Sequence, residues 1–382
     1  MKNLRSLSAL STIGTLGLLA LPAAAADFKA GAWDLSVGGF VNAYYTHASC
    51  SGDQTFTGSG LALASKGLGC GGNDKSTVIG NGLLPNALIT SAKTQQAGWD
   101  LGATLMIGAA TSSSDSISNN SNVDVRQAFL TFGRADTGSF KLGRDYGLYG
   151  QNAILSDMTL VGAGATVAAT QRNRVTLGHI GSGYSYLGHY GQIAYTTPSA
   201  GGLSATLALM SPVDAFTGVA KADDTPQVQA MLVYAAQGLK GWAAVKSQKF
   251  KDAGDGFNMS GVELGGSWSG NGFGLLANVQ SGKGIGVLAD GDSGDLKQTN
   301  VLLQGTVEAG ASLKLGLGYG QSRIKDGSGT DLRDNNNLTA GAYYKLTPSL
   351  TLVGELSRTQ SKTFDGAKAR MNGLAAGAIL FF

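Results

Sequence analysis

The sequence is poor in charge, in proline and in residues that bind metals. Charged residues make up only 14% of the 382 residues, and the chain has 6 prolines, 2 cysteines and 3 histidines. Lys and Arg number 28 against 25 Asp and Glu, so no polybasic surface indicates a nucleic-acid partner. The histidines, His47, His179 and His189, lack the spacing of a metal pair. We therefore expect no nucleic acid, no metal and no other cofactor.

Catalytic motifs are also missing from the sequence. No Gly-x-Ser-x-Gly nucleophile elbow occurs, and the serine-rich stretches have the composition of hydrated loops. The glycine-rich segment 67–72 neither follows an expected strand nor opens an expected helix, which argues against a phosphate-binding loop. The sequence therefore predicts a protein that is not an enzyme.

No apolar run of about 18 residues follows the N-terminal segment, which excludes helical membrane spans. Residues 1–26 have a basic start (Lys2, Arg5), an apolar stretch from about Leu10 to Leu21 and a final run of alanines. That stretch is too short for a spanning helix, which needs ~20 apolar residues. We interpret residues 1–26 as a cleaved signal peptide and residues 27–382 as a single exported domain.

Glycine is abundant, with 59 residues, and turn signals recur along the chain. Short turns are expected at 97–100, 135–138, 198–202, 237–241, 270–272, 308–311 and 346–349. Longer polar segments lie near 47–81, 111–122, 150–189, 211–225, 250–257, 282–297, 324–335 and 360–368. Seven short turns and eight long loops connect sixteen antiparallel strands, with both termini on the short-turn side. This asymmetry is typical of transmembrane β-barrels.

The expected strands alternate between an apolar face and a mixed polar face. In segment 312–319, for example, every second residue is Leu or Tyr. Charges at Glu263, Lys314 and Glu355 then face inward. A Lys or Arg on the lipid face costs ~2–4 kcal/mol at mid-membrane, so we expect these charges to line a wet interior. A soluble β-sandwich is the alternative, but its outer faces need more solvating residues than these strands offer.

The C-terminal strand ends in an aromatic residue. Leu380 and Phe382 complete an apolar stripe with small residues between, so one face of this strand favours hydrocarbon. An aromatic C-terminus of this kind resembles the tail that the bacterial outer-membrane assembly machinery reads. The resemblance implies that this machinery is a partner and that the chain is a multi-pass barrel of the outer membrane.

The two cysteines, Cys50 and Cys70, lie in one glycine- and serine-rich stretch. In an exported protein the compartment is oxidising, so the pair most simply forms a disulfide, with two free thiols as the alternative. A loop of roughly 20 residues closed in this way is stabilised by ~3 kcal/mol in the chain-entropy model.

Several stretches resemble the general bacterial porins. These are residues 125–133, 137–144, 145–149 and 195–203, together with the N-terminal segment, the seven-turn plan and the terminal Phe382. The resemblance implies an all-β, sixteen-stranded antiparallel transmembrane barrel that assembles as a homotrimer in a bilayer with lipopolysaccharide. It also implies that the third long loop, about 150–189, folds into the barrel and narrows it.

The resemblance also assigns residues to the narrow part of the pore. They are Arg126 on the fourth strand, Arg144 and Tyr146 on the fifth strand, and Asp157 in the third loop. Farther along the chain, either Arg172 or Arg174 matches the family's next basic residue, and the alignment leaves this choice open. One carboxylate facing up to four arginines predicts a weak to moderate preference for anions, because low-dielectric walls focus the potential of fixed charges. The alternative for each arginine is a structural pair with Asp124 or Asp145.

These features together predict a passive diffusion channel for small hydrophilic solutes and ions. The alternative is a substrate-specific channel for sugars, phosphate or carboxylates, because tyrosines cluster in and before the third loop, at Tyr146, Tyr149, Tyr184, Tyr186 and Tyr190. Tyrosine is also common in the interfacial girdle of membrane proteins, so the cluster alone does not decide between the two.

Overall fold

The computed structural model describes residues 25–53, 56, 60–112, 123–218, 220–251 and 256–382. The first half of this part contains β1 (Ala26–Ala30), β2 (Trp33–Gly52), α1 (Lys66–Gly69), β3 (Lys75–Gly80), β4 (Asn86–Gln96), β5 (Trp99–Ala109), β6 (Val123–Arg134), β7 (Gly138–Tyr146), α2 (Gln151–Ser156), the 3-10 helix η1 (Met158–Val161), α3 (Ala168–Asn173), β8 (His189–Thr196) and β9 (Leu203–Met210). The second half contains β10 (Lys221–Ala222), β11 (Gln227–Ala236), β12 (Leu239–Lys251), β13 (Phe257–Gly270), β14 (Phe273–Lys283), β15 (Lys297–Glu308), β16 (Leu313–Ile324), β17 (Leu332–Lys345), β18 (Leu350–Thr363) and β19 (Lys368–Phe381).

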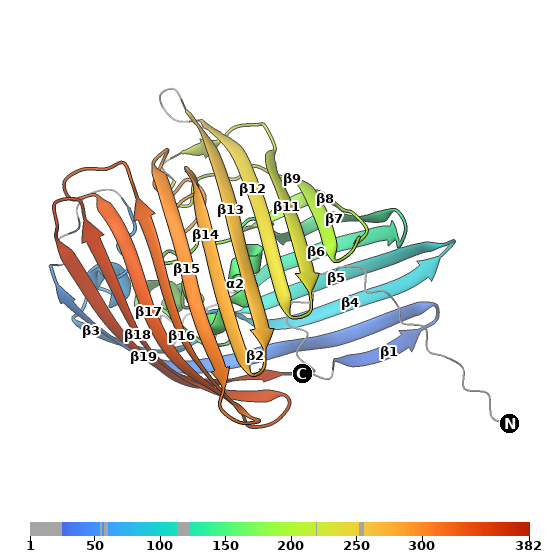
Figure 1. Cartoon of the computed structure of the whole chain (residues 1–382), viewed down its shortest axis with the longest axis horizontal. Coiled ribbons are helices and arrows are strands. Elements are labelled where there is room, and N and C mark those ends of the chain that lie inside the picture. The colour runs from blue at the N-terminus through green and yellow to red at the C-terminus, as the bar shows by residue number, and fades with distance from the viewer. Residues whose placement is uncertain (1–24, 54–55, 57–59, 113–122, 219, 252–255) are drawn as a thin grey trace.

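The strands form one closed antiparallel barrel (Figure 1). Each strand from β4 to β9 and from β11 to β19 pairs with its neighbours in sequence, and β19 pairs with β2 to close the ring. Both β3 and β4 pair with β2, so together they occupy the second position of the ring. Short β1 and β10 add to β2 and β12 at the rims. The described residues therefore give sixteen strand positions, which confirms the predicted fold class.

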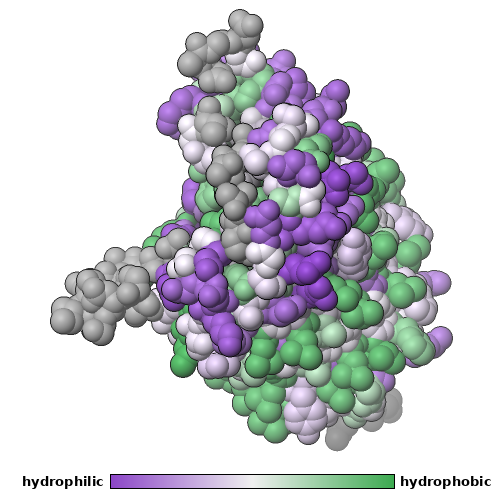
Figure 2. All heavy atoms as spheres, turned by 90° about the vertical axis from the view of Figure 1, so that its left-hand side faces the viewer, coloured by the Kyte–Doolittle hydropathy of each residue, from purple (hydrophilic) through white to green (hydrophobic). Residues whose placement is uncertain are grey.

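The seven predicted short turns and the predicted alternation are both confirmed. Hairpin turns connect β4 to β5, β6 to β7 and the later pairs at the expected places. Along β15, Leu303 is half exposed on the outer face, whereas Leu302 and Asn300 are buried inside. The loop expected at 47–81 is shorter, because β2 continues to Gly52 in register with β19. Figure 2 views the molecule from the left-hand side of Figure 1. Hydrophilic side chains gather over the upper and central part of this face, and hydrophobic ones lie below and to the right.

Aromatic side chains surround the short-turn end of the barrel. The rings of Trp99, Phe132, Phe140 and Tyr195 follow one another across β5 to β8, with centroid separations of 6.1, 5.3 and 5.0 Å. Such girdles lie at the edge of the hydrocarbon layer in membrane barrels. No helix of the described part is both long and apolar enough to cross a membrane.

The C-terminal strand closes the barrel as a full member of the wall. Phe381 pairs with Phe40 on β2, and their ring centroids are 5.8 Å apart. The backbone of Phe382 donates to the Gly39 carbonyl at 3.0 Å and accepts from the Gly39 N–H at 2.8 Å. Leu380 and Phe382 are exposed on the outer side. The last apolar stripe therefore faces away from the bore, as predicted.

The predicted disulfide is present between Cys50 and Cys70. It joins the extended end of β2 to the residue that follows α1, and both cysteines are buried. The bond thus fixes the first long loop to the barrel wall.

Candidate functional site

The segment between β7 and β8, residues 147–188, folds into the barrel and is called the inner loop below. It carries α2, η1 and α3, and Figure 1 shows α2 surrounded by the strands. Its residues contact strands far away in sequence, on the opposite wall. The inner loop therefore occupies part of the bore.

Two carboxylates of the wall hold the backbone of the inner loop. Glu263 of β13 accepts a hydrogen bond from the Gly150 N–H at 2.6 Å. Glu355 of β18 accepts from the N–H groups of Ala163 at 2.8 Å and Gly164 at 2.7 Å. Irregular loops leave backbone donors that neither helix nor sheet satisfies, and a carboxylate is a strong acceptor for them.

These contacts correct the expectation that both glutamates line open water. Their side chains do face inward, but Glu263 is only 1% exposed and Glu355 only 2%, because the inner loop covers them. Lys314 also faces inward on β16, where its Nζ lies 5.3 Å from the centre of the Tyr343 ring and borders open space.

Amide side chains of the wall hold further parts of the inner loop. Gln229 of β11 accepts from the Leu148 and Tyr149 N–H groups, Gln280 of β14 accepts from Ser185, and Gln304 of β15 accepts from Met158, at distances of 2.7–2.9 Å. On β2, the Tyr44 hydroxyl donates to the Val161 carbonyl at 2.7 Å. The loop is thus attached at its start, middle and end.

Asp157 lies inside the inner loop and does not face the bore. Its carboxylate contacts His179 Nδ1 at 3.0 Å and accepts from the Tyr184 hydroxyl at 2.8 Å and the Thr159 N–H at 2.9 Å. Burial by itself raises the pKa of Asp157, but His179 and the Thr159 N–H outweigh it and lower that pKa. Burial lowers the pKa of His179, but Asp157 outweighs it and raises that pKa. The pair therefore joins the first half of the inner loop to the second half.

Two of the predicted arginines meet at one carboxylate. Arg126 of β6 donates its Nε–H to Asp124 at 2.9 Å, and Arg174, which follows α3, contacts the same Asp124 oxygen through Nη1. Arg126 is 7% exposed and its Nη1 lies 3.5 Å from the Tyr186 hydroxyl, whereas 41% of the Arg174 side chain is exposed. The geometry thus brings Arg174, rather than Arg172, beside Arg126.

The other predicted pore residues, Arg144, Tyr146 and Arg172, do not lie together. Arg144 is exposed on the face of β7 that also carries Phe140, so it points outward, and its Nε–H donates to the Val125 carbonyl at 3.0 Å. Arg144 is two residues before Tyr146, so strand alternation predicted that both side chains point into the bore. However, β7 ends at Tyr146 and the chain turns inward there. Tyr146 is buried and borders the bore, whereas Arg172 is exposed on α3, next to the first long loop.

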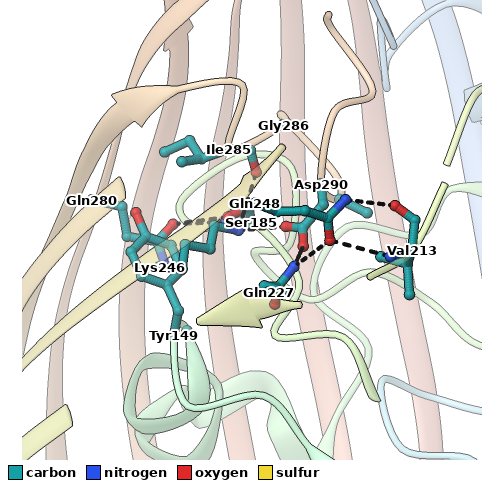
Figure 3. A network of polar contacts seen from close by, with 12 residues as sticks. Tyr149, Ser185, Val213, Gln227, Lys246, Gln248, Gln280, Ile285, Gly286 and Asp290 are labelled. Atoms are coloured by element: carbon teal, nitrogen blue, oxygen red, sulfur yellow. Dashed lines mark hydrogen bonds and ion pairs between the residues drawn. The ribbon is translucent and has the colours of Figure 1, made fainter. Parts of the chain in front are cut away.

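A buried ion pair that we did not predict lies on the other side of the bore. Lys246 of β12 contacts Asp290 of the 284–296 loop at 2.5 Å, and its Nζ lies 4.5 Å from the centre of the Tyr149 ring (Figure 3). Gln227 also donates to Asp290, at 3.0 Å (Figure 3). The alternation of β12 was sufficient to find Lys246, because it shares the inward face with Trp242.

Two cavities lie on either side of the inner loop. One, of about 550 Å³, is bordered by the inner loop, by β6 to β8 and by the 81–85, 211–216 and 284–290 loops, and is called the loop-side cavity. The other, of about 340 Å³, extends to the short turns at Glu308 and Lys345 and is called the turn-side cavity. Leu155 and Leu160 border both cavities, so they lie between the two spaces.

The model of the family described as "Gram-negative porin" matches residues 9–363 of the chain. The chain belongs to this porin family. The porin is thus an outer-membrane β-barrel that serves as a diffusion channel. In the described part, no cluster of three or more His, Cys, Asp or Glu side chains is arranged to hold a metal ion. No curated protein matches the sequence significantly.

Solved structures share the fold of this porin. An anion-selective porin from Comamonas acidovorans has 16% sequence identity and a TM-score of 0.66, over 92% of this chain and 100% of that one. The outer-membrane channel DcaP of Acinetobacter baumannii has 16% identity and a TM-score of 0.69, over 94% and 100%. Salmonella typhi OmpF, in a complex with daunomycin, has 16% identity and a TM-score of 0.65, over 94% and 100%.

Proposed function

We propose that this porin passes small hydrophilic solutes and ions passively, with a weak preference for anions. The observation that carries the preference is the pairing of two arginines, Arg126 and Arg174, with the single carboxylate of Asp124. A low-dielectric wall focuses the potential of such fixed charges on the bore. Transport needs only a solute gradient, and we expect no catalytic turnover.

The carboxylates that border the loop-side cavity do not offset the excess charge of Arg126, Arg174 and Asp124. Asp145 contacts Lys141, Asp214 contacts Lys221 and Asp290 contacts Lys246. Each of these acids has its own lysine, so the described charged groups around the cavity sum to about one positive charge. A single charge supports a weak preference and not a strict anion filter.

Burial of the tyrosines argues against a sugar-specific channel. Tyr149, Tyr184 and Tyr190 are at most 4% exposed, so they pack the loop and the wall. Tyr146, Tyr186 and the buried Tyr190 border the loop-side cavity, and only Tyr146 and Tyr186 lie there beside the arginines. An aromatic track for sugars needs several exposed rings in succession, and this arrangement supports the diffusion channel instead.

Reversal potentials in asymmetric KCl test the preference, with the Arg174→Gln variant as the main perturbation. One charge about 6 Å from a permeating ion changes its energy by ~0.7 kcal/mol at the dielectric constant of water, with opposite signs for chloride and potassium, so the chloride-to-potassium permeability ratio should fall by up to about tenfold. Arg172→Gln removes the same charge two residues earlier and should leave the ratio unchanged. Cation selectivity of the wild-type protein would refute the proposal.

We also infer that the porin forms homotrimers through the outer face of its early strands. Ala103 of β5 and Ala128 of β6 face outward there, and small side chains allow barrels to approach closely. Arg144 is exposed on the same face, opposite Ala128 in the β6–β7 pair. The molar mass of the detergent-solubilised protein by light scattering tests this, and a monomer would contradict it.

The outer surface at the long-loop end supports lipopolysaccharide as a partner. Arg358 of β18 and Lys368 and Arg370 of β19 are exposed, and closer to the short turns the same faces carry Leu356 and Leu374. Basic groups above an apolar band suit anionic lipid headgroups. Native mass spectrometry should detect bound lipopolysaccharide, and the Arg358→Gln, Arg370→Gln double variant should retain less.

Export and assembly complete the proposal. We expect the N-terminus of the purified mature protein to be Asp27, after removal of residues 1–26, and Edman sequencing checks this. The outward aromatic end supports recognition by the outer-membrane assembly machinery, so a variant lacking Phe382 should accumulate in the periplasm.

A further inference from the structure

The loop-side cavity is unusual for a hydrophilic pore because most of its wall is apolar. Its apolar lining includes Leu84, Ile154, Leu155, Leu177, Leu187 and Leu288, from the inner loop and two neighbouring long loops. The volume, about 550 Å³, lies in the range of ligand pockets rather than of ion-sized gaps. Apolar walls with a few convergent polar groups are typical of binding sites for small organic molecules.

The positive charge of this wall is concentrated at one place. Arg126 and Arg174 border the cavity next to the Tyr146 and Tyr186 rings. Arg174 is the more accessible of the two, and its planar guanidinium suits a carboxylate. One end of the cavity therefore offers an anion site, and the rest is mostly hydrocarbon apart from polar groups such as Asp290.

The exit toward the short turns is apolar as well. Leu155 and Leu160 border both cavities, so a solute that moves from one cavity to the other beside them meets apolar side chains. Strongly hydrated solutes lose water there without a polar replacement, which costs free energy. The apolar part of a solute does not pay this desolvation cost when it contacts the leucines.

We propose that the loop-side cavity is a subsite for amphipathic monocarboxylates, with the carboxylate at Arg174 and the hydrocarbon part against the leucines. This rests on the diffusion-channel function and names the solute class that the channel favours. A sugar acid leaves its hydroxyl groups against Leu155 and its neighbours without partners. A dicarboxylate must place its second charge either on those leucines or close to Asp145 and Asp290.

Current block of the wild-type channel by matched anions tests the proposal. Hexanoate and gluconate are both six-carbon monocarboxylates, but gluconate carries hydroxyl groups along its chain. Each buried methylene strengthens binding by roughly fourfold, so the half-blocking concentration should fall about fifteenfold over the two methylenes from butyrate to hexanoate. Gluconate should block no better than butyrate, and hexylammonium, with the opposite charge, should not block through this site.

Variants assign the block to the two parts of the site. Leu155→Asn replaces a partly buried side chain with a polar one of similar size and should weaken hexanoate block by about fourfold. Arg174→Gln should weaken block by hexanoate and butyrate by the same factor. Val161→Thr is the matched control, because Val161 borders only the turn-side cavity, and it should leave the block unchanged.

The outcomes separate this inference from the function on which it rests. Absence of KCl conductance in reconstituted bilayers would overturn both. Normal KCl conductance with equal block by hexanoate and gluconate would overturn the subsite alone. Preferential hexanoate block that survives both variants would also overturn it, because the hydrocarbon would then bind elsewhere.

Discussion

The attachment of the inner loop to Glu355 gives the sharpest structural prediction. In a Glu355→Ala variant, the N–H groups of Ala163 and Gly164 and the Tyr343 hydroxyl lose their acceptor. All three groups are buried between the inner loop and the barrel wall. Alanine also leaves space behind residue 162, into which the loop or water can move.

The size of the effect follows from the three hydrogen bonds. A hydrogen bond to a charged group contributes ~1.5–3 kcal/mol, so the variant loses at most about 5–9 kcal/mol of loop attachment. Water that enters the space recovers part of this. Glu263 still holds Gly150 and Gln304 still holds Met158, so we expect only the middle of the loop to leave the wall.

Single-channel recording is the assay. We expect the Glu355→Ala variant to show increased open-channel noise and a conductance different from wild type, because the middle of the inner loop is no longer fixed to the wall. Glu355→Gln is the matched control, since its amide oxygen can still accept from both backbone N–H groups, and it should resemble wild type. The barrel hydrogen bonds do not involve this side chain, so unheated samples of both variants should resist SDS.

The reasoning fails on one result in particular. If Glu355→Ala conducts like wild type, with the same noise and the same size limit for neutral sugars, the carboxylate is not an anchor. Hydrogen exchange of residues 161–165 gives an independent measurement, and unchanged protection there would lead to the same conclusion.

Three further predictions concern the loops. Cys50→Ser opens a disulfide between residues 20 apart in sequence and should lower stability by ~3 kcal/mol, measured by thermal unfolding with the reduced wild type as control. The Asp157–His179 lock should weaken as pH rises through the raised pKa of His179 and as pH falls through the lowered pKa of Asp157, and Asp157→Asn should remove this dependence in hydrogen exchange. Gly162→Ala places its Cβ 2.0 Å from a Glu355 oxygen and should disturb the loop, whereas Gly354→Ala, with open space around it, should not, as judged by open-channel noise.

Local patterns were enough to predict the barrel. Turn residues and the period-2 alternation are properties of short segments, so the sequence determined the strand count, the seven hairpins and the outward face of β19 without knowledge of distant contacts. The disulfide was predictable for a similar reason, because its cysteines are only 20 residues apart.

The path of the inner loop was decided only in the tertiary structure. Ala163 and Glu355 are separated by 192 residues, and no local pattern shows that a backbone N–H will meet that carboxylate. For the same reason, the sequence predicted that Asp157 faces the bore. The structure instead buries its side chain against His179. A transmembrane strand obeys a repeating rule, whereas a loop goes where its unpaired donors find acceptors, and those acceptors come from the whole barrel.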